Sequence, residues 1–223
     1  MPEEPRTGVV LLAAGRGTRF GPAPKLLADL GGKPLVRHAA EAACAARVGP
    51  VVAVLGAHAE GIRAALAGLD LACVENPDYG AGLSTSLRAG LAALPEAVVG
   101  ALVLLGDMPG VTARHLDRLA EAFRAADPTP AAVVPVRGGR RGNPVLLNRR
   151  LLEADLACLA GDRGAGPILA GRADVLEIAG DAATALDIDT PAALRRADHL
   201  SRAGEVESAE RGASEACGPS GGN

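Results

Sequence analysis

The stretch that decides the fold is Val9-Val10-Leu11-Leu12-Ala13-Ala14-Gly15-Arg16-Gly17-Thr18-Arg19-Phe20-Gly21, with Lys25 just beyond it. Val9 to Leu12 form a continuous apolar run, which is typical of a strand buried on both faces of a parallel sheet. The alanines and glycines that follow allow a ligand to lie directly on the backbone. Arg19 and Lys25 add a planar guanidinium and a compact ammonium. The stretch therefore predicts a polyphosphate-binding loop after the first strand.

This loop differs from the two common phosphate-binding motifs. A Walker A loop ends in Gly-Lys-Ser/Thr, whereas Gly17 is followed by Thr18 and Arg19. A dinucleotide-binding motif has a third glycine where this chain has Phe20. An ordinary strand-to-helix turn with solvent-facing Arg and Lys is the alternative interpretation, and the two cations favour the phosphate site over it.

Apolar runs and helical patterns alternate along the chain, which predicts a mostly parallel α/β sheet with helices on both faces. Strands are expected at 9–12, 50–55, 71–75, 101–105, 131–136, 144–147, 175–179 and 185–188. Helices are expected at 33–47, 58–66, 83–94, 112–125, 149–159, 165–170 and 191–199. The run at 101–105 is the most apolar and is expected to be central, whereas 144–147 is expected at an antiparallel edge. We expect one domain over 1–200.

Composition narrows the classes of function. The chain has 223 residues with a net charge of −3, which disfavours a nucleic-acid binder. No apolar run approaches the roughly 18 residues of a membrane span, and no secretory signal is evident. The four cysteines lack metal-binding spacing, so a cytoplasmic protein with reduced, mostly buried thiols is expected. Aromatic residues make up 1%, which argues against base recognition by aromatic stacking.

Residues 201–223 are rich in Gly, Ser and Glu and are expected to be a disordered tail.

An acidic residue follows the most apolar strand, in Gly106-Asp107-Met108-Pro109. Ligands of open α/β sheets bind beyond the carboxyl ends of the strands, so Asp107 is expected beside the phosphate loop. A carboxylate facing a triphosphate requires a divalent cation between them, and Mg²⁺ accepts one or two carboxylates together with phosphate oxygens. The alternative role of a helix cap is weaker, because Thr112 is better placed to cap the next helix.

A second acidic point is Asp187-Ile188-Asp189-Thr190-Pro191. Residues two apart on an extended strand face the same side, so the two carboxylates could converge as metal ligands. Asp189 could equally cap the helix that Pro191 opens.

Asn76 and the turn at 80–86 are a third candidate group. Asn76 ends a predicted strand at the binding edge, and its amide can both donate and accept hydrogen bonds. Gly82 and Ser84 open the next helix, whose N-terminus can meet polar ligand atoms. Plain turn and capping chemistry would produce the same composition.

Four of these motifs carry a family resemblance: the glycine loop, Gly-Asp-Met-Pro, the late Asp-Thr-Pro and the stretch around Asn76. The pattern Leu11-Leu12-Ala13-Ala14-Gly15-x-Gly17-x-Arg19-Phe20-Gly21-x-x-x-Lys25 resembles that of nucleotidyltransferases with the molybdopterin-guanylyltransferase-like fold. Gly-Asp-Met-Pro resembles the metal motif of the same enzymes. Within them the chain is most similar to molybdenum cofactor cytidylyltransferases, which carry Ala-Ala-Gly where guanylyl members carry Gly-Gly. The resemblance extends over about residues 8–200 and implies a three-layer, Rossmann-like nucleotide-diphospho-sugar transferase fold.

The resemblance also implies an activity and its residues. CMP would pass from CTP to the terminal phosphate of molybdenum-carrying molybdopterin, with Mg²⁺ as cofactor and a molybdoenzyme or its chaperone as partner. Catalytic roles fall on Lys25, Arg19 and Asp107, and metal binding on Asp107 and Asp189, with Asp187 in support. The nucleotide is expected to contact Leu12, Ala13, Ala14, Gly15, Gly17, Arg19, Lys25, Asn76, Gly82 and Ser84.

The chain departs from the cytidylyltransferase pattern in its second half. Asn143 stands where these enzymes usually have His, and Gly166 where they have Arg. Both positions lie in the half that receives the second substrate, and Arg140, Arg141 and Arg163 are the nearby cations. The identity of the acceptor is therefore left open. Alternatives are transfer from GTP or to a sugar- or alcohol-phosphate, a nicotinamide-dependent oxidoreductase, and a molybdopterin chaperone without catalysis.

Overall fold

The computed structural model describes residues 6–21, 23–182 and 188–198. The strands are β1 (Arg6–Ala13), β2 (Asp29–Leu30), β3 (Lys33–Pro34), β4 (Val51–Leu55), β5 (Ala72–Glu75), β6 (Val98–Leu105), β7 (Ala132–Arg137), β8 (Arg140–Arg141), β9 (Val145–Asn148) and β10 (Val175–Ala179). The α-helices are α1 (Leu35–Ala45), α2 (Ala59–Ala65), α3 (Leu83–Ala93), α4 (Ala113–Ala125), α5 (Glu153–Ala157) and α6 (Gly166–Leu169). Short 3₁₀ helices are η1 (Thr18–Phe20), η2 (Lys25–Leu27) and η3 (Tyr79–Ala81).

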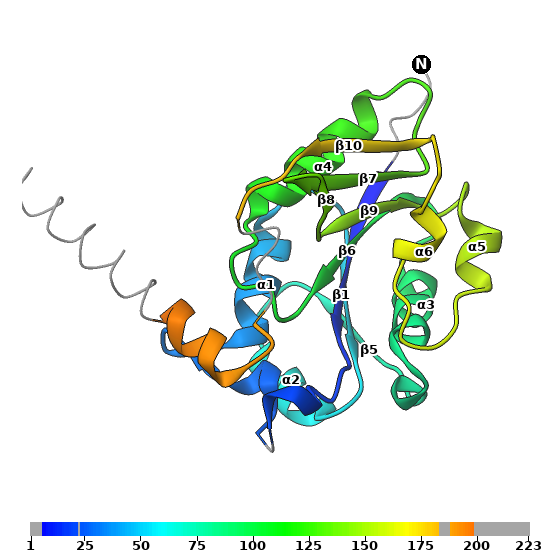
Figure 1. The fold of residues 1–223 in the computed structure, drawn as a ribbon. Helices are drawn as coiled ribbons and strands as arrows, with labels where there is room; N and C mark the ends of the chain where they lie inside the picture. The colour runs from blue at the N-terminus through cyan, green and yellow to red at the C-terminus, as the bar shows by residue number, and fades with distance from the viewer. Residues whose placement is uncertain (1–5, 22, 183–187, 199–223) are drawn as a thin grey trace, which may run out of the picture.

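The main sheet has the strand order β10-β7-β9-β6-β1-β4-β5, with β8 paired to β7. β1 pairs in parallel with both β6 and β4, and β4 with β5. The predicted central strand at 101–105 is confirmed, because β6 lies between β1 and β9. The mostly parallel sheet carries α1, α2 and α4 on one face and α3, α5 and α6 on the other (Figure 1). This is the predicted three-layer, nucleotide-diphospho-sugar transferase architecture.

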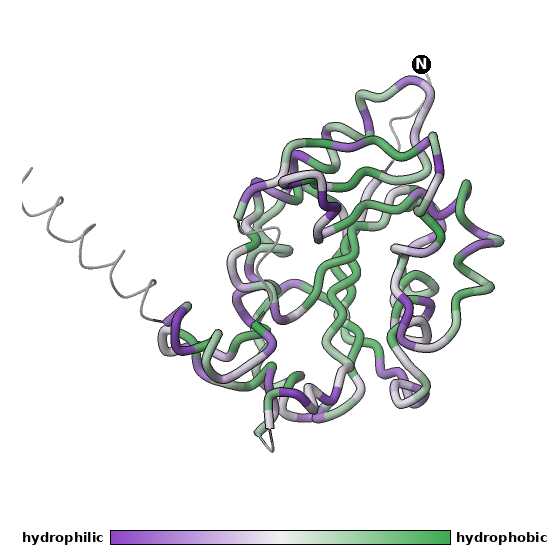
Figure 2. The backbone as a smooth tube through the Cα atoms, viewed as in Figure 1, coloured by the Kyte–Doolittle hydropathy of each residue, from purple (hydrophilic) through white to green (hydrophobic). Residues whose placement is uncertain are grey.

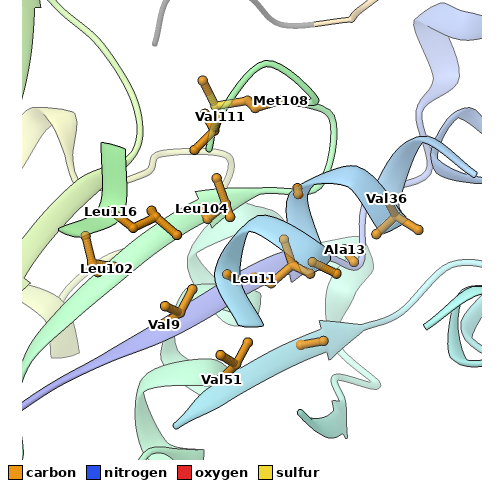
Figure 3. Packing of buried hydrophobic residues seen from close by; sticks show 14 of the residues in the cluster. Val9, Leu11, Ala13, Val36, Val51, Leu102, Leu104, Met108, Val111 and Leu116 are labelled. Atoms are coloured by element: carbon orange, nitrogen blue, oxygen red, sulfur yellow. The ribbon is translucent and has the colours of Figure 1, made fainter. Parts of the chain in front are cut away.

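Two hydrophobic clusters hold the layers together, and β1 contributes alternate residues to each. Val9, Leu11 and Ala13 pack with α1, α2 and α4, while Val10 and Leu12 pack with the helices of the other face. Figure 2 shows the hydrophobic segments running through the middle of the sheet. Figure 3 shows Leu11 and Ala13 near Val36 of α1. The predicted burial of the first strand on both faces is therefore confirmed.

The strand expected at a sheet edge is instead an interior one. β9 runs antiparallel to β6 on one side and to β7 on the other. Its residues Leu146 and Leu147 are both fully buried, one in each hydrophobic cluster. A strand that buries both faces gains the most apolar area in the middle of the sheet, which is why the edge placement was wrong.

Other differences are local. Lys33 and Pro34 belong to a two-stranded ribbon with Asp29 and Leu30 and precede the helix. The two short helices expected near 149–159 and 165–170 are trimmed to α5 and α6. Helical structure covers 191–198, as expected for the closing helix. The strand predicted at 185–188 lies largely, and the tail at 201–223 wholly, outside the described residues.

The thiols are more accessible than expected. Cys44 and Cys73 are half-buried and Cys158 is exposed, and all three are free, while Cys217 lies outside the described residues. Desolvation raises the pKa of both Cys44 and Cys73 above the ordinary thiol value. Among the described residues, no helix is long and apolar enough to cross a membrane.

Candidate active site

The parallel pairing of β1 and β6 brings the phosphate loop and the acidic turn together. Leu12 pairs with Leu105 at the last position of the register, so both strands end side by side. The Gly106 amide then donates to the Leu12 carbonyl at 3.0 Å. Met108 is fully buried in the cluster beneath α1 and α4 and anchors one side of the turn. Asp107, between these two anchored residues, lines the cavity at the carboxyl edge of the sheet.

A left-handed glycine brings Lys25 against the loop. Gly17 has φ 61° and ψ 33°, a conformation that costs a residue with a side chain more than it costs glycine. A Cβ at position 17 would also lie 2.8 Å from the Cβ of Lys25. Glycine at this position therefore permits both the turn and the close approach of Lys25.

Lys25 bridges the two predicted metal carboxylates. Its Nζ donates to Asp107 Oδ2 at 2.5 Å and to Asp189 Oδ1 at 2.7 Å, and its side chain is only 8% exposed. Arg19 Nη1 lies 3.1 Å from Asp189 Oδ2. The hydrogen bond from Lys25 is the main reason that the pKa of Asp189 lies below its usual value, with the charges of Lys25 and Arg19 adding to it. Four charged side chains from three separate segments thus form one cluster.

One carboxylate oxygen of the cluster would suit a further cation. Asp107 Oδ1 is buried and accepts no hydrogen bond from the described residues. A buried carboxylate oxygen without a partner is costly, and a divalent cation would satisfy it. No group of three or more His, Cys, Asp or Glu side chains suited to a metal occurs in the described part of the chain. Two carboxylates completed by phosphate oxygens match the preference of Mg²⁺, so these residues fit a metal that binds together with a nucleotide.

The charged cluster forms part of the wall of a cavity of about 490 Å³. Its lining residues come from the β1 loop, the turn after β5, the β6 turn and the loop before α6. They are Leu12, Ala14, Gly15, Arg16, Gly17, Thr18, Arg19, Lys25, Leu26, Tyr79, Gly80, Gly82, Leu83, Ser86, Leu105, Gly106, Asp107, Asp162 and Asp189.

Most of the residues predicted from sequence lie together at this cavity, and three do not line it. Ala13 is fully buried in the opposite cluster, because alternate residues of β1 face opposite sides. Ser84 is fully buried, and its hydroxyl has no hydrogen-bond partner among the described residues. The Asn76 amide donates to Thr85 Oγ1 at 2.8 Å and Ser86 Oγ at 3.0 Å, and its Oδ1 accepts from the Asp78 amide. Asp187 lies outside the described residues.

Sequence reasoning missed Arg16, Tyr79 and Asp162. The Cζ atom of Arg16 lies 5.4 Å from the centroid of the Tyr79 ring, and both residues line the cavity. Tyr79 is the only tyrosine of the chain, and it lines the cavity although aromatic residues make up 1% of the sequence. The position of Tyr79 directly after the Asn76-Pro77-Asp78 turn was the available signal, since that turn follows a strand at the binding edge.

A second cavity of about 260 Å³ shares Leu12, Leu83 and Leu105 with the first. Asn143 and Gly166, which depart from the family pattern, both line it, as does Arg141. The Arg141 guanidinium donates to Glu177 Oε1 at 2.9 Å and to the Leu169 carbonyl at 2.8 Å. Arg140 and Arg163 are not among the described residues that line either of these two cavities.

A glycine loop whose cations pair with two carboxylates in the wall of a cavity is the arrangement of an α/β domain that handles nucleotides. A family model described as "MobA-like NTP transferase domain" matches residues 9–177, and the chain belongs to this family of nucleotidyltransferases.

Proteins similar to this chain carry the names of different enzyme activities. The chain is 34% identical over 186 residues to nicotine blue oxidoreductase of Paenarthrobacter nicotinovorans, covering 81% of this chain and 91% of that protein. It is 35% identical over 142 residues to 2-C-methyl-D-erythritol 4-phosphate cytidylyltransferase of Streptomyces avermitilis, covering 60% and 56%.

Solved structures match over nearly the whole described chain. Rv0371c from Mycobacterium tuberculosis H37Rv superposes with a TM-score of 0.76 at 29% identity, covering 88% of this chain and 100% of that one. A complex of the same protein with manganese has a TM-score of 0.71 at 30% identity, covering 87% and 98%.

Proposed function

We propose that this protein is a Mg²⁺-dependent cytidylyltransferase. It transfers CMP from CTP to the terminal phosphate of molybdenum-molybdopterin, giving the cytosine dinucleotide and pyrophosphate. The observation that carries the proposal is the cluster of Lys25, Asp107 and Asp189, which lines the 490 Å³ cavity together with the glycine loop. Family membership supports the transfer of a nucleotidyl group.

The loop residues bind and orient the triphosphate in this proposal. Amides of the loop around Gly15 and Gly17 hold phosphate oxygens, and Arg19 holds the leaving pyrophosphate. Lys25 supplies positive charge where negative charge builds up in the transition state. The acceptor phosphate is already a nucleophile, so positioning and charge neutralisation replace a strong general base.

Asp107 and Asp189 would hold the metal. Bound Mg²⁺ neutralises charge on the phosphate oxygens in this kind of transfer. Asp107 Oδ1, which accepts no hydrogen bond from the residues that the structure describes, is the feature that fits such an ion. The manganese complex of Rv0371c supports a divalent cation in this family without fixing which one.

The second cavity is the proposed site of the molybdopterin-type acceptor. It adjoins the nucleotide cavity through Leu12, Leu83 and Leu105, so an acceptor there would approach the nucleotide. Asn143 and Gly166 line it and leave less charge at these positions than the usual His and Arg. A sugar- or alcohol-phosphate would meet the same walls, and a molybdoenzyme or its chaperone would take the product. We propose a cytoplasmic protein with a single catalytic domain over 1–200.

Preference for CTP over GTP rests on Ala14, which lines the cavity. A methyl group there limits how closely a ring can approach the backbone, and a pyrimidine is the smaller ring. Packing alone discriminates by about 1–3 kcal/mol, so backbone hydrogen bonds must contribute. The test is kcat/KM for both nucleotides in the wild type and in Ala14→Gly. We expect the wild type to favour CTP and the variant to lose part of that preference, whereas equal use of GTP by the wild type would contradict the cytidylyl assignment.

A nicotinamide-dependent oxidoreductase is the second candidate, favoured by the 34% identity to nicotine blue oxidoreductase. An oxidoreductase would have no evident use for the carboxylate pair and its buried lysine. NADPH oxidation measured with a quinoid dye acceptor separates the two. Dye-dependent NADPH consumption without nucleotide-dependent pyrophosphate release would favour the oxidoreductase. Binding of molybdopterin with neither activity would favour a chaperone.

A further inference from the structure

An aromatic ring covered by an arginine lines the same cavity as the acidic cluster. Tyr79 begins η3 after β5, and Arg16 belongs to the loop after β1. The Arg16 guanidinium lies over the Tyr79 ring with its Cζ 5.4 Å from the centroid. Its Nη2 is also close to Gly80, where an added Cβ would lie 3.2 Å away. The arginine side chain therefore spans two segments of the cavity wall.

Gly56 lies between Tyr79 and Ala14, and its lack of a side chain lets the two residues approach each other. A Cβ at Gly56 would lie 2.7 Å from the Cβ of Tyr79 and 2.8 Å from that of Ala14, so no larger residue fits between them. The Ala57 amide donates to the Ala14 carbonyl at 3.0 Å and fixes the spacing. Tyr79 also packs against the cluster around α3. The Cβ of Tyr79 thus lies close to the residue to which we assign the nucleobase.

The chemistry of this pair suits a nucleotide. Nucleobases stack on aromatic side chains because every base has a π face. A guanidinium over the same face is held by cation–π attraction, which is modest at exposed sites. Arg16 is exposed, and a triphosphate on the adjacent loop would offer its charge a stronger partner.

We propose that Tyr79 is the stacking surface for the nucleobase and that Arg16 covers this surface until a phosphate chain draws it away. This inference rests on the proposed nucleotide site and adds two residues that set its specificity. Arg16 then has opposite effects on two ligands. It competes with a nucleoside for the ring, and it attracts a nucleoside triphosphate.

Calorimetric titration with cytidine and with CTP in the presence of Mg²⁺ tests this. Tyr79→Leu keeps apolar volume and removes the π face, while Tyr79→Phe is the matched control that keeps the face. We expect Tyr79→Leu to weaken CTP binding on the order of tenfold, and Tyr79→Phe to stay within about twofold of the wild type. Arg16→Met keeps the length of the side chain and removes its charge. It should tighten cytidine binding and weaken CTP binding.

Tryptophan fluorescence gives a second readout that a purely structural role would not move. The chain has no tryptophan, so Tyr79→Trp can be excited selectively at the red edge of indole absorption, where CTP absorbs little. Stacking of the base should quench this emission, and pyrophosphate alone should raise it by drawing Arg16 off the ring.

The outcomes separate the two proposals. Failure of the wild type to bind any nucleoside triphosphate would overturn the proposed function together with this inference. Equal CTP affinity of the wild type and a folded Tyr79→Leu variant would overturn the inference alone. Parallel changes in cytidine and CTP affinity in Arg16→Met would also overturn it, because a covering role requires opposite signs.

Discussion

At the scale of single residues, Lys25 holds the charged cluster of the site together. Its ammonium is almost fully buried between Asp107 and Asp189 and offsets their mutual repulsion. A lysine side chain is rarely buried unless it is paired, because desolvation of its charge is costly. In the proposed function the same ammonium meets the incoming triphosphate. Lys25 would then pair with the two proposed metal ligands until the triphosphate binds.

We predict that Lys25→Met destabilises the metal-free protein and that Mg²⁺ restores much of the loss. Removing the ammonium leaves two facing carboxylates without their buried partner. Breaking a fully buried pair costs about 3–5 kcal/mol, and the 40% exposure of Asp189 reduces the expected cost to about 1–3 kcal/mol. Thermal unfolding with and without MgCl₂ measures both effects.

Lys33→Met is the matched control for that experiment. Lys33 pairs with Glu41 on the surface, where its side chain is 49% exposed, so its loss should change the melting temperature little and show no response to Mg²⁺. A Lys25→Met variant as stable as the wild type, or one indifferent to Mg²⁺, would contradict the proposed arrangement of charges.

The sequence singled out four charged residues that the structure brings into one cluster, and their roles stay predictions. Arg19, Lys25 and Asp107 stood out by residue type beside glycines and a strand end, whereas Asp189 was preferred as a metal ligand only through the family resemblance. Asn76 was expected to face a ligand, and its amide instead fastens the turn to Thr85 and Ser86. Whether a polar group faces inward or bonds to its own turn depends on packing that a single sequence does not reveal.

At the scale of elements, the sheet positions the site through close helix packing. Gly90 of α3 sits directly on β1 and β4, where an added Cβ would lie 2.3 Å from a Val10 methyl and 2.8 Å from a Val54 methyl. α3 thus approaches the sheet more closely than any residue with a side chain would allow at this position. Because Leu83 at the start of α3 lines both cavities, this packing sets their shared wall.

We predict that Gly90→Ala destabilises the protein by about 1–3 kcal/mol through overpacking, despite the higher helix propensity of alanine. For a chain of this size that corresponds to a melting temperature lower by roughly 2–10 °C. Gly166→Ala in α6 is the control, because an added Cβ there meets no atom of the described residues within 4 Å. Equal melting temperatures for both variants would show that α3 shifts freely on the sheet.

Element order could be predicted because periodicity and turn residues are local properties. The residues of β9 were predicted as a strand, but its position in the sheet was wrong. Which strands become neighbours in a sheet depends on burial across the whole fold. The β2–β3 ribbon was missed although Gly31-Gly32 carries the signal of a tight turn, with φ of 59° and 81° at the two glycines. Each strand of the ribbon has two residues, which is too short for strand periodicity to be recognised.

At the scale of the whole molecule, a segment distant in sequence completes the site. The Ile188 amide donates to the Asp107 carbonyl at 3.1 Å, and its side chain is fully buried with Phe20, Leu30 and Leu35. This small cluster ties the late segment to both the loop after β1 and the start of α1. The packing of Ile188 in this cluster holds the neighbouring Asp189 within hydrogen-bond distance of Lys25.

We predict that Ile188→Ala raises the Mg²⁺ concentration needed for half-maximal activity and lowers kcat, although Ile188 does not line the nucleotide cavity. Removing the buried side chain loosens the backbone that carries Asp189, and misplacement of a catalytic group by about 1 Å can cost on the order of a hundredfold. Leu194→Ala alters the same cluster from the helix beyond Asp189 and should affect Mg²⁺ dependence less. Identical Mg²⁺ dependence in the two variants would argue against a specific role for Ile188.

The most direct test of the account is pyrophosphate release from CTP by wild type and Asp107→Asn at saturating Mg²⁺, with purified molybdopterin as acceptor. Asn preserves the shape of the side chain and removes the charge that the metal requires. Loss of several kcal/mol of transition-state stabilisation predicts a rate lower by on the order of a hundredfold or more, in a variant whose circular dichroism matches that of the wild type. Near-normal turnover by folded Asp107→Asn would contradict the account.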